Sequence, residues 1–563
     1  MALPLFVTAL ISKWLFPVIA EKMTIECSRA PGTNSSAVQI WPRFVVSRSF
    51  SISSAAISLS WPAEPRARAA TWAIDSSSAP PRPSMMIGFS GVHLIALRHQ
   101  VKSPADITST FAPKAVALSN YFNFCSGNYF WAHVINVRMS LNVKSAIVVG
   151  VVSLLFLWVR LDHLSDRLTV GTDQGIHFLE MYNIVKSQRI TLIGPVSSFN
   201  ANGRQFFFGP ATYYFALPVF YLSNWNPLAV SYFLILVQFL AFFICFYAVY
   251  RLYDRAVALY FLLLASVTPI VVNYSRFLWN PNLMLVASAI LLAVLVIVRK
   301  KPQSSIWFFL IGVLFGLGLQ FHYAFMLTII LTIVVILYWK IFHVRKFLFC
   351  AVGFVVGFLP LVIFELRHGF YNLKTIILFF SYQPEKISLE FPVGYIQDYH
   401  FLSLVPYLLL FFAYLFKKFT FANRFLAFVV LLAFLFLSLV SLVPVPAHGF
   451  RTSDDWNYKS ALEIRDIIRG ENLPLYNIVD LLTGDTRAMF VRSMLVTGGH
   501  APLGVTKYSE SSYLFIYSKM PIEEILGGDL WEITSVKPVV LLKWWEVKDG
   551  IYLYLVGKTG TKQ

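Results

Sequence analysis

The sequence predicts an all-α bundle that crosses a membrane many times and carries a small α/β domain after its last span. Of the 563 residues, 57% are hydrophobic and 13% are charged, whereas soluble domains carry about 25% charged residues. Apolar stretches near the roughly 20 residues needed to cross a bilayer recur along the chain. The composition becomes that of a soluble domain only after residue 443.

The net charge of +18 is explained by membrane topology rather than by binding of nucleic acid. The Lys and Arg residues gather in short loops between apolar stretches, which is typical of a topology signal and of attraction to anionic lipid headgroups. We therefore expect membrane lipids, and no nucleic acid, among the partners. The four cysteines have no spacing typical of a disulfide framework or a metal site.

The first 138 residues are rich in Ser, Ala, Pro and Arg and lack sustained helical or strand periodicity. Two interpretations of this extension, 1–138, remain open. It is a disordered cytoplasmic segment, or it results from an upstream start and Met139 begins the protein. Met139 is followed by Lys144 and an apolar run, as in a short cytoplasmic start.

Nine apolar stretches are expected to span the membrane, within a transmembrane domain that covers residues 139–443. They are Ser145–Val159, Pro227–Tyr250, Ala256–Tyr274, Pro281–Val298, Ile306–Gln320, Ala324–Trp339, Phe347–Phe364, Phe401–Phe416 and Phe425–Val443. Pro210–Leu222 is too short to cross comfortably and is interpreted as a juxtamembrane or re-entrant helix.

The basic loops predict the orientation of these spans. Placing Lys144 inside puts every dense basic loop on the inner side, namely Arg251–Arg255, Arg299–Lys301, Lys340–Lys346 and Lys417–Arg424. The polar loop 162–208 and the segment 444–563 then face outward. We therefore expect a plasma-membrane or inner-membrane protein whose site and C-terminal domain are extracytoplasmic.

The segment 444–563 has the pattern of a small α/β domain. One amphipathic helix is expected at Ser460–Arg469, and period-2 patterns predict strands at Tyr476–Leu481, Ser512–Tyr517, Val539–Trp545 and Gly550–Val556.

Asp173 is the candidate catalytic residue of loop 162–208. It lies in Gly171-Thr172-Asp173-Gln174-Gly175 and opens a predicted helix, Gln174–Lys186. An Asp at this position is either an N-cap that accepts a backbone N–H, or a carboxylate that acts as a base or orients an acceptor. The sequence leaves both interpretations open.

Other ionisable residues fall at the predicted outer ends of spans. Basic side chains there match phosphate oxygens or simply extend to the membrane interface: Arg204, Arg276, Arg367 and His368. Glu365 is expected to pair with one of these cations or to orient an acceptor. His322, which ends an apolar span, is either a structural histidine or part of the site.

Several kinds of site have no motif in this sequence. There is no phosphate-binding Gly-rich loop with Lys-Ser/Thr, no zinc-type His or Cys cluster and no Gly-x-Ser-x-Gly elbow. Ionisable residues are nearly missing from the centres of the spans, which argues against an ion-coupled transporter.

The outer motifs, taken in order, resemble those of a known family. They are Thr172-Asp-Gln-Gly175, Gly209–Pro218, Tyr274–Asn282, Gln320-Phe-His322 and Phe364–Phe370. From Ser145 to Val443 the chain resembles the C-type superfamily of membrane glycosyltransferases, which share the GT-C fold. Within it, the chain resembles bacterial and archaeal relatives of protein O-mannosyltransferases and of lipid A aminoarabinose transferase.

The resemblance implies a hexosyl- or pentosyltransferase. Such an enzyme moves a sugar from a polyprenyl-phosphate-linked donor to a lipid, glycan or protein acceptor outside the membrane. It makes Asp173 the catalytic base or acceptor-orienting group and suits Arg276, Arg367 and His368 to the donor phosphate. Gln174 stands where many relatives have Glu, and Arg276–Asn282 contains no carboxylate. A divalent metal is therefore doubtful, and no other cofactor is expected.

Two alternatives come from other classes of protein. A transporter or flippase of lipid-linked saccharides would share the basic outer residues but would not need Asp173 as a base. A non-catalytic assembly subunit would act through the tail 444–563 and would not need Asp173 at all.

Overall fold

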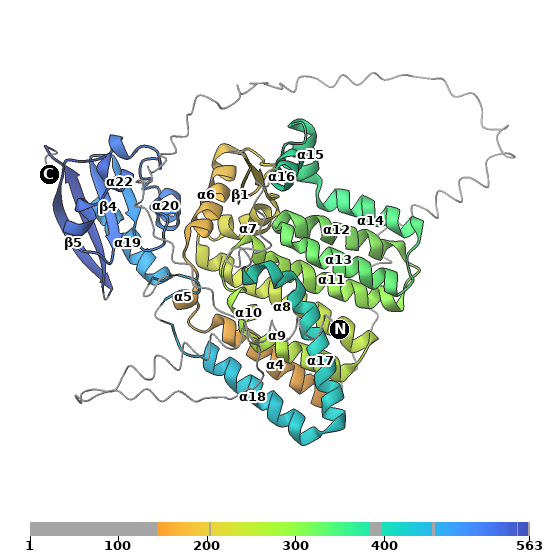
Figure 1. Cartoon of the computed structure of the whole chain (residues 1–563). Coiled ribbons are helices and arrows are strands. Elements are labelled where there is room, and N and C mark those ends of the chain that lie inside the picture. Colours follow the sequence, from red (N-terminus) through yellow and green to blue (C-terminus); the bar gives the residue numbers. More distant parts are fainter. Residues whose placement is uncertain are drawn as a thin grey trace, which may run out of the picture. The chain divides into compact units, whose positions relative to one another are not determined.

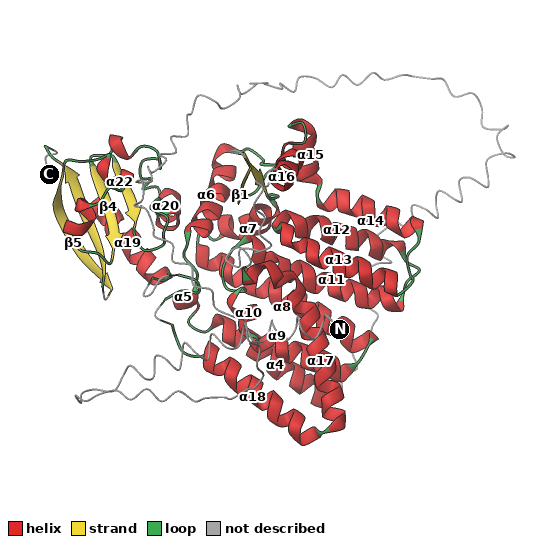
Figure 2. Cartoon of the chain, in the orientation of Figure 1, coloured by secondary structure: helices red, strands yellow, loops and turns green. Residues whose placement is uncertain are grey.

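A computed structural model describes residues 143–201, 204–381, 397–446, 448–452, 456–548 and 550–560. All of them belong to the unit Leu118–Gln563. They form a helical bundle and a separate four-stranded sheet with helices on it (Figures 1 and 2). The extension 1–138 and Met139 lie outside the described residues.

The bundle is built from long apolar helices and their shorter companions. Its members are α4 (Val143–Leu161), α8 (Pro227–Leu252), α9 (Arg255–Val267), α10 (Pro269–Asn273), α11 (Leu283–Lys300), α12 (Ser305–Phe321), α13 (Met326–Tyr338), α14 (Val344–Gly357), α15 (Leu359–Arg367), α17 (Val405–Ala422) and α18 (Arg424–Leu442). Short 3₁₀ turns precede three of them: η2 (Asn280–Asn282), η3 (Tyr323–Phe325) and η4 (Asp398–Leu404).

Each expected span coincides with a helix or with two helices that a short break separates. Among the described residues, however, five helices are long and apolar enough to cross a membrane, or up to six if the pair α14–α15, bent by 72°, is one span. The span predicted at Ala256–Tyr274 is divided because Pro269 holds Thr268 in extended backbone. The multi-pass bundle is therefore supported, and the number nine stays a prediction.

Helices α12 and α14 pack through two glycine pairs, Gly312/Gly316 and Gly353/Gly357. A Cβ on Gly312 would lie 1.9 Å from the carbonyl oxygen of Cys350, and one on Gly353 would lie 2.1 Å from that of Phe309. Glycines four residues apart let two helices approach through their backbones, which is a common way to pack helices in lipid.

Two contacts join basic segments that are predicted to lie on the same side of the membrane. Lys417, in the last turns of α17, pairs with Asp254 between α8 and α9 at 2.6 Å. The Arg299 guanidinium at the end of α11 lies 5.2 Å from the ring centroid of Trp339, beside the end of α13. Within each of these two pairs, the two segments, all predicted to be inner, therefore lie at the same end of the bundle. Which end faces outward stays a prediction.

The polar loop 162–208 folds into short elements between α4 and α8. They are α5 (Leu164–Arg167), α6 (Thr172–Ser187), β1 (Val196–Ala201), β2 (Arg204–Phe207) and, just after the loop, α7 (Ala211–Leu222). The hairpin β1–β2 is antiparallel. Helix α16 (Tyr371–Ser381) holds its edge, because the Asn372 amide exchanges two hydrogen bonds with the backbone of Phe207.

The C-terminal domain has a mixed sheet in the order β3-β4-β6-β5. Its strands are β3 (Tyr476–Asp480), β4 (Tyr513–Ser518), β5 (Val539–Lys548) and β6 (Ile551–Lys558), and its helices are α19 (Tyr458–Glu471), α20 (Met489–Thr497), α21 (Ile522–Gly527) and α22 (Trp531–Thr534). Every residue of β4 is buried, as in a strand with both faces covered. The predicted α/β domain is present, and its extracytoplasmic position stays a prediction.

The glycine contact between α12 and α14 leads to a stability prediction. We expect Gly312→Ala to destabilise the folded protein by about 1–3 kcal/mol, because its methyl group collides with the Cys350 carbonyl. Gly150→Ala on α4 is the matched control, since a Cβ there meets nothing within 4 Å. Thermal unfolding in detergent, followed by size-exclusion of the surviving protein, measures the difference. Equal survival of both variants would contradict this packing.

Candidate active site

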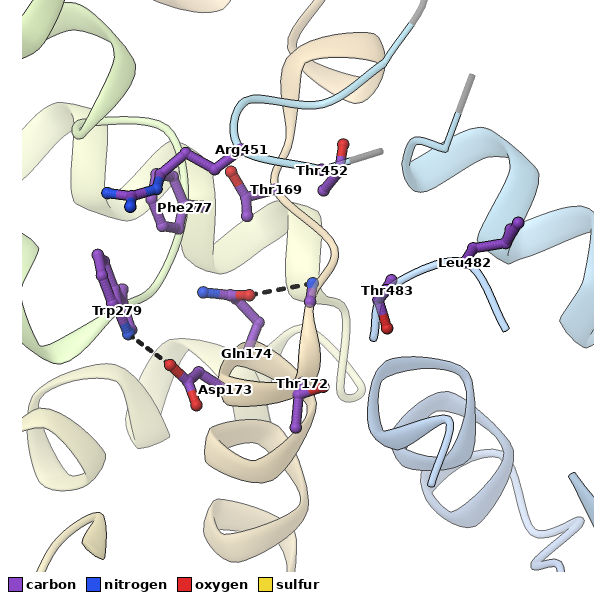
Figure 3. A pocket seen from close by; sticks show the side chains of 11 residues that line it. Thr169, Thr172, Asp173, Gln174, Phe277, Trp279, Arg451, Thr452, Leu482 and Thr483 are labelled. Atoms are coloured by element: carbon purple, nitrogen blue, oxygen red, sulfur yellow. Dashed lines mark hydrogen bonds between the residues drawn. The ribbon is translucent and has the colours of Figure 1, made fainter. Parts of the chain in front are cut away.

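A cavity of about 300 Å³ opens at the first turn of α6 (Figure 3). Four parts of the chain line it: the start of α6, the segment before η2, the segment after α18 and the loop after β3. The lining residues are Thr169, Gly171, Thr172, Asp173, Gln174, Phe277, Trp279, Arg451, Thr452, Leu482 and Thr483. The bundle and the C-terminal domain therefore both contribute walls.

Asp173 lies in the first turn of α6 and is not its N-cap. The N-cap is Gly171, and its N–H donates to Oε1 of Gln174 at 3.0 Å. The interpretation of Asp173 as the capping residue is therefore wrong, because α6 already begins at Thr172. The Asp173 side chain is exposed toward the cavity, where the positive end of the helix dipole favours its charge.

Trp279 is the side chain that contacts the Asp173 carboxylate. Its indole Nε1–H donates to Oδ2 of Asp173 at 3.0 Å. Among the described residues, none donates a hydrogen bond to Oδ1. One carboxylate oxygen is therefore held, and the other is available to a bound molecule.

Arg451 brings a positive charge to the cavity. Its Nη1 donates to Oδ1 of Asp398 at 2.8 Å, its Nη2 donates to Gln397, and the guanidinium lies 5.8 Å from the ring centroid of Trp279. It is the one Lys or Arg among the described lining residues. A carboxylate and a guanidinium therefore share one small cavity.

The C-terminal domain closes the side of the cavity opposite Trp279 (Figure 3). Its lining residues Leu482 and Thr483 follow β3 in a turn that Asp480 organises. Oδ1 of Asp480 accepts the Leu482 N–H at 2.7 Å and the Thr483 N–H at 3.1 Å. This turn presents the Thr483 side chain in a fixed place.

Gly175 brings the C-terminal domain against α6. A Cβ at this position would lie 2.2 Å from the backbone carbon of Met489. The contact continues one turn along, where the rings of Phe178 and Phe490 lie 6.1 Å apart. The backbones of α6 and α20 therefore touch beside the cavity.

His177 stabilises the first turn of α6 through a contact with its backbone. It is buried, its Nδ1 lies 2.5 Å from the carbonyl oxygen of Asp173, and its ring packs edge-on against Tyr213. Burial lowers the pKa of His177, so the ring is neutral at physiological pH. A neutral buried ring here packs the helix without adding charge beside Asp173.

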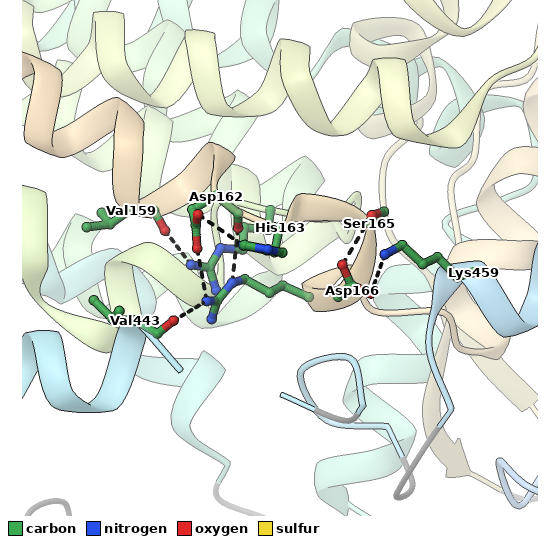
Figure 4. Close-up of polar contacts among 9 residues, drawn as sticks. Val159, Asp162, His163, Ser165, Asp166, Val443 and Lys459 are labelled. Atoms are coloured by element: carbon green, nitrogen blue, oxygen red, sulfur yellow. Dashed lines mark hydrogen bonds and ion pairs between the residues drawn. The ribbon is translucent and has the colours of Figure 1, made fainter. Parts of the chain in front are cut away.

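Arg276 is next to Phe277 but is turned away from the cavity. It is 2% exposed, and its guanidinium donates to the Asn273 side chain and to the carbonyl of Val159. Figure 4 labels Val159, whose carbonyl oxygen accepts this hydrogen bond, close to Asp162. Arg276 therefore joins the loop before η2 to the end of α4.

His322 reaches the site only through intervening rings. Its ring packs edge-on against Tyr399 at 5.7 Å, and Tyr399 packs against Trp279 at 4.7 Å. Its Nδ1 accepts the N–H of Ala324. Burial, together with His400, lowers the pKa of His322 to about 3. A neutral imidazole is poorly suited to neutralise a phosphate.

The remaining predicted residues lie around α15, α16 and β2 and do not line the cavity. Glu365 caps α16, because its carboxylate accepts the N–H groups of Asn372 and Leu373 at 3.1 and 3.2 Å. The His368 ring stacks on Phe364 at 4.4 Å. Arg204 and Arg367 are exposed. The structure therefore does not bring these four residues to Asp173.

The sequence reasoning missed Trp279, Arg451 and Thr483. Trp279 stands inside the Tyr274–Asn282 motif, where an indole N–H beside an expected site was a usable signal. Arg451 and Thr483 come from segments with no motif, and only folding brings them near Asp173. Among the described residues, no three His, Cys, Asp or Glu side chains gather as a metal site requires, and metal dependence stays a prediction.

Part of the bundle matches a known family by sequence. Residues 209–364 match the model of the family described as Dolichyl-phosphate-mannose-protein mannosyltransferase. The resemblance to C-type membrane glycosyltransferases is therefore confirmed over this part of the bundle. No curated protein matches the chain by sequence.

Two solved structures are also similar. ArnT from Cupriavidus metallidurans bound to undecaprenyl phosphate is 11% identical, and the alignment covers 74% of this chain and 98% of that chain with a TM-score of 0.45. The Archaeoglobus fulgidus oligosaccharyltransferase in complex with zinc and sulfate is 12% identical over 66% of this chain and 67% of that chain, with a TM-score of 0.41. Because these TM-scores are below 0.5, no residue role is transferred from either structure.

The α6–α20 contact leads to a second stability prediction. At a helix position where a Cβ has free space, Gly→Ala raises the free energy of unfolding by about 0.5–1 kcal/mol. We expect this increase for Gly470→Ala, because a Cβ on Gly470 meets nothing within 4 Å. We expect Gly175→Ala to have the opposite sign, since its methyl group collides with the backbone of Met489.

Thermal unfolding of the two purified variants in detergent tests this sign difference. Partial proteolysis adds a local readout, because a displaced α20 would release the C-terminal domain more readily. An increase in stability for both variants would contradict the close contact.

Proposed function

We propose that this chain is a hexosyl- or pentosyltransferase that moves a sugar from a polyprenyl-phosphate-linked donor to an acceptor on the outer face of the membrane. The observation that carries the proposal is the cavity in which Asp173 and Arg451 meet. The family match over residues 209–364 supports this class of donor. In this proposal 139–443 is the catalytic membrane domain and 444–563 is an extracytoplasmic domain that completes the acceptor side.

Asp173 acts as the general base. A lone pair on the acceptor hydroxyl oxygen attacks the anomeric carbon, the bond from that carbon to the phosphate oxygen breaks, and the hydroxyl proton passes to Asp173. The leaving group departs as a polyprenyl phosphate with the bonding electron pair. A base positioned in this way contributes about 10²–10⁴-fold in rate. A single displacement inverts the anomeric configuration.

Arg451 stabilises the negative charge that develops on the leaving phosphate. Guanidinium groups match phosphate oxygens and keep their charge. Nη1 of Arg451 donates to Tyr274 and Asp398, and Nη2 donates once, to Gln397. The Nε–H and the second N–H of Nη2 are left for a ligand. The Asp398 pair thus fixes the cation in place before the donor binds, so that little reorganisation is required during transfer.

The residues chosen from the sequence take other parts in this proposal. Arg276 anchors the segment before η2 to α4, and Glu365 caps α16 away from the cavity. His322 packs behind Tyr399. The exposed Arg204 and Arg367 contact anionic headgroups at the membrane surface, and the exposed His368 lies at the same interface. The acceptor is a lipid, a glycan or a protein.

The first functional prediction concerns Asp173. We expect Asp173→Asn to lower transfer by about 10²–10⁴-fold, because the amide cannot take the acceptor proton. The assay uses membranes that contain the full chain and radiolabelled polyprenyl-phosphate hexoses and pentoses, starting with polyprenyl-phosphate mannose. Radiolabel is then counted in the lipid, glycan and protein fractions.

Asp466→Asn is the matched control, since Asp466 is exposed on α19 and, among the described residues, pairs with its neighbour Arg465. It should retain wild-type transfer. If Asp173→Asn transfers sugar at the wild-type rate while correctly folded, the transferase mechanism fails. Movement of lipid-linked sugar across the membrane by that variant would then favour the flippase.

The second functional prediction concerns Arg451. We expect Arg451→Ala to raise the KM for the donor by about 10–100-fold, because one charge-assisted hydrogen bond contributes about 1.5–3 kcal/mol. Arg451→Lys should fall between this variant and the wild type. Arg465→Ala on α19 is the control. An unchanged donor KM with a raised acceptor KM would place Arg451 at the acceptor instead.

A further inference from the structure

Trp279 makes a contact with the proposed base that packing alone does not require. Its Nε1–H donates to Oδ2 of Asp173 at 3.0 Å across 106 positions of sequence. An indole has one donor and no acceptor, so a Trp packed for its hydrophobic surface alone can point that donor to any carbonyl or to water. Here the donor points at one carboxylate oxygen.

The neighbours of Trp279 hold the direction of its N–H. The edge of Tyr399 packs against it at 4.7 Å, and the rings of Tyr274 and Phe277 lie nearly parallel to it at 6.3 and 6.2 Å. The Arg451 guanidinium lies 5.8 Å from its centroid, a distance at which a cation is attracted to an indole face. The indole is therefore restrained by three rings and one cation.

The Arg451 side chain is itself held in place, and a series of contacts connects it through Trp279 to Asp173. Nη1 of Arg451 donates to the Asp398 carboxylate at 2.8 Å and also to the hydroxyl of Tyr274. The contacts thus run from Asp398 to Arg451, from Arg451 to Trp279 and from Trp279 to Asp173. The proposed phosphate-binding cation and the proposed base are joined by one aromatic side chain.

We infer that Trp279 is a positioning residue that fixes the rotation of the Asp173 carboxylate, so that Oδ1 faces the acceptor hydroxyl. Oδ2 is held by the indole, and Oδ1 accepts no hydrogen bond from the residues that the structure describes. A base held in one rotation meets its substrate without first losing rotational freedom. This inference rests on the proposed function, since it assigns Trp279 a role only if Asp173 is the base.

A second role for the indole, as a platform for the sugar ring, is less compatible with these contacts. A platform needs an open face, whereas Tyr274, Phe277 and Arg451 flank the faces of Trp279. The kinetic constants separate the two roles. Loss of a platform raises the KM of the donor, whereas loss of a positioning contact lowers kcat.

Trp279→Phe tests the inference, because phenylalanine keeps an aromatic ring and lacks the N–H. In full-length protein assayed with polyprenyl-phosphate mannose, or with the donor that replaces it in the assay above, we expect kcat to fall by about 10–100-fold. We expect the KM of the donor to stay within about threefold and the melting temperature to be unchanged. Trp279→His, which keeps a ring N–H, should recover part of the lost kcat.

Trp544→Phe is the matched control, since Trp544 is 57% exposed on the edge strand β5. It should have wild-type kinetics. In the double variant Asp173→Asn/Trp279→Phe, the second substitution should cause no further loss, because there is no base left to position.

Four outcomes separate this inference from the proposed function. An inactive Asp173→Asn with a fully active Trp279→Phe overturns the inference alone. A raised donor KM, or a lower melting temperature that accounts for the loss, also overturns it in favour of binding or packing. Additive losses in the double variant exclude an effect through Asp173. A fully active Asp173→Asn overturns the proposed function, and the inference with it.

Discussion

The contact between α6 and α20 at Gly175 is the constraint on which the candidate site depends. A single methyl group there would lie 2.2 Å from the Met489 backbone, so the two helices meet through their main chains. Helix α6 presents Asp173 from its first turn, and the domain that contains α20 presents Thr483. The distance between the backbones of α6 and α20 at this contact therefore sets how far apart the Asp173 carboxylate and the Thr483 hydroxyl lie across the cavity.

Buried arginines join helix ends at the same end of the bundle. Arg160 is fully buried and donates to the carbonyl oxygens of Phe156, Ser266 and Ala265. Arg167 donates to the carbonyl of Val443, where α18 ends. Ala265 and Ser266 lie in the last turn of α9, and Val443 is the C-cap of α18. Carbonyls at these positions have no partner within the helix and carry the negative end of the dipole. Each guanidinium thereby joins two helix ends, and the segment that leads from α18 to Arg451 starts from a fixed point.

Much of the fold could be predicted from local pattern. Strands β3, β4, β5 and β6 and helix α19 lie within a few residues of their predicted ranges. The reason is that the spacing of hydrophobic residues, every second residue in a strand and about every 3.6 residues in a helix, can be recognised within each segment by itself. The division of the loops between two bundle ends also follows from charge, as the Lys417–Asp254 pair illustrates. The helix lengths could not be predicted in this way. The break at Thr268 and the 72° bend between α14 and α15 depend on how each segment packs.

The sequence by itself determined that this is a multi-pass membrane protein with a small α/β domain, and it singled out Asp173 as a polar residue among apolar helices. Those conclusions depend on composition and on neighbours within one turn. Only the tertiary structure decided which residues surround Asp173. It replaced Arg276, His322 and Glu365, which serve as packing and capping groups, with Trp279, Arg451 and Thr483. The reason is physical: a hydrogen bond of 3.0 Å between residues 106 positions apart depends on how the helices cross, and no local pattern encodes that distance.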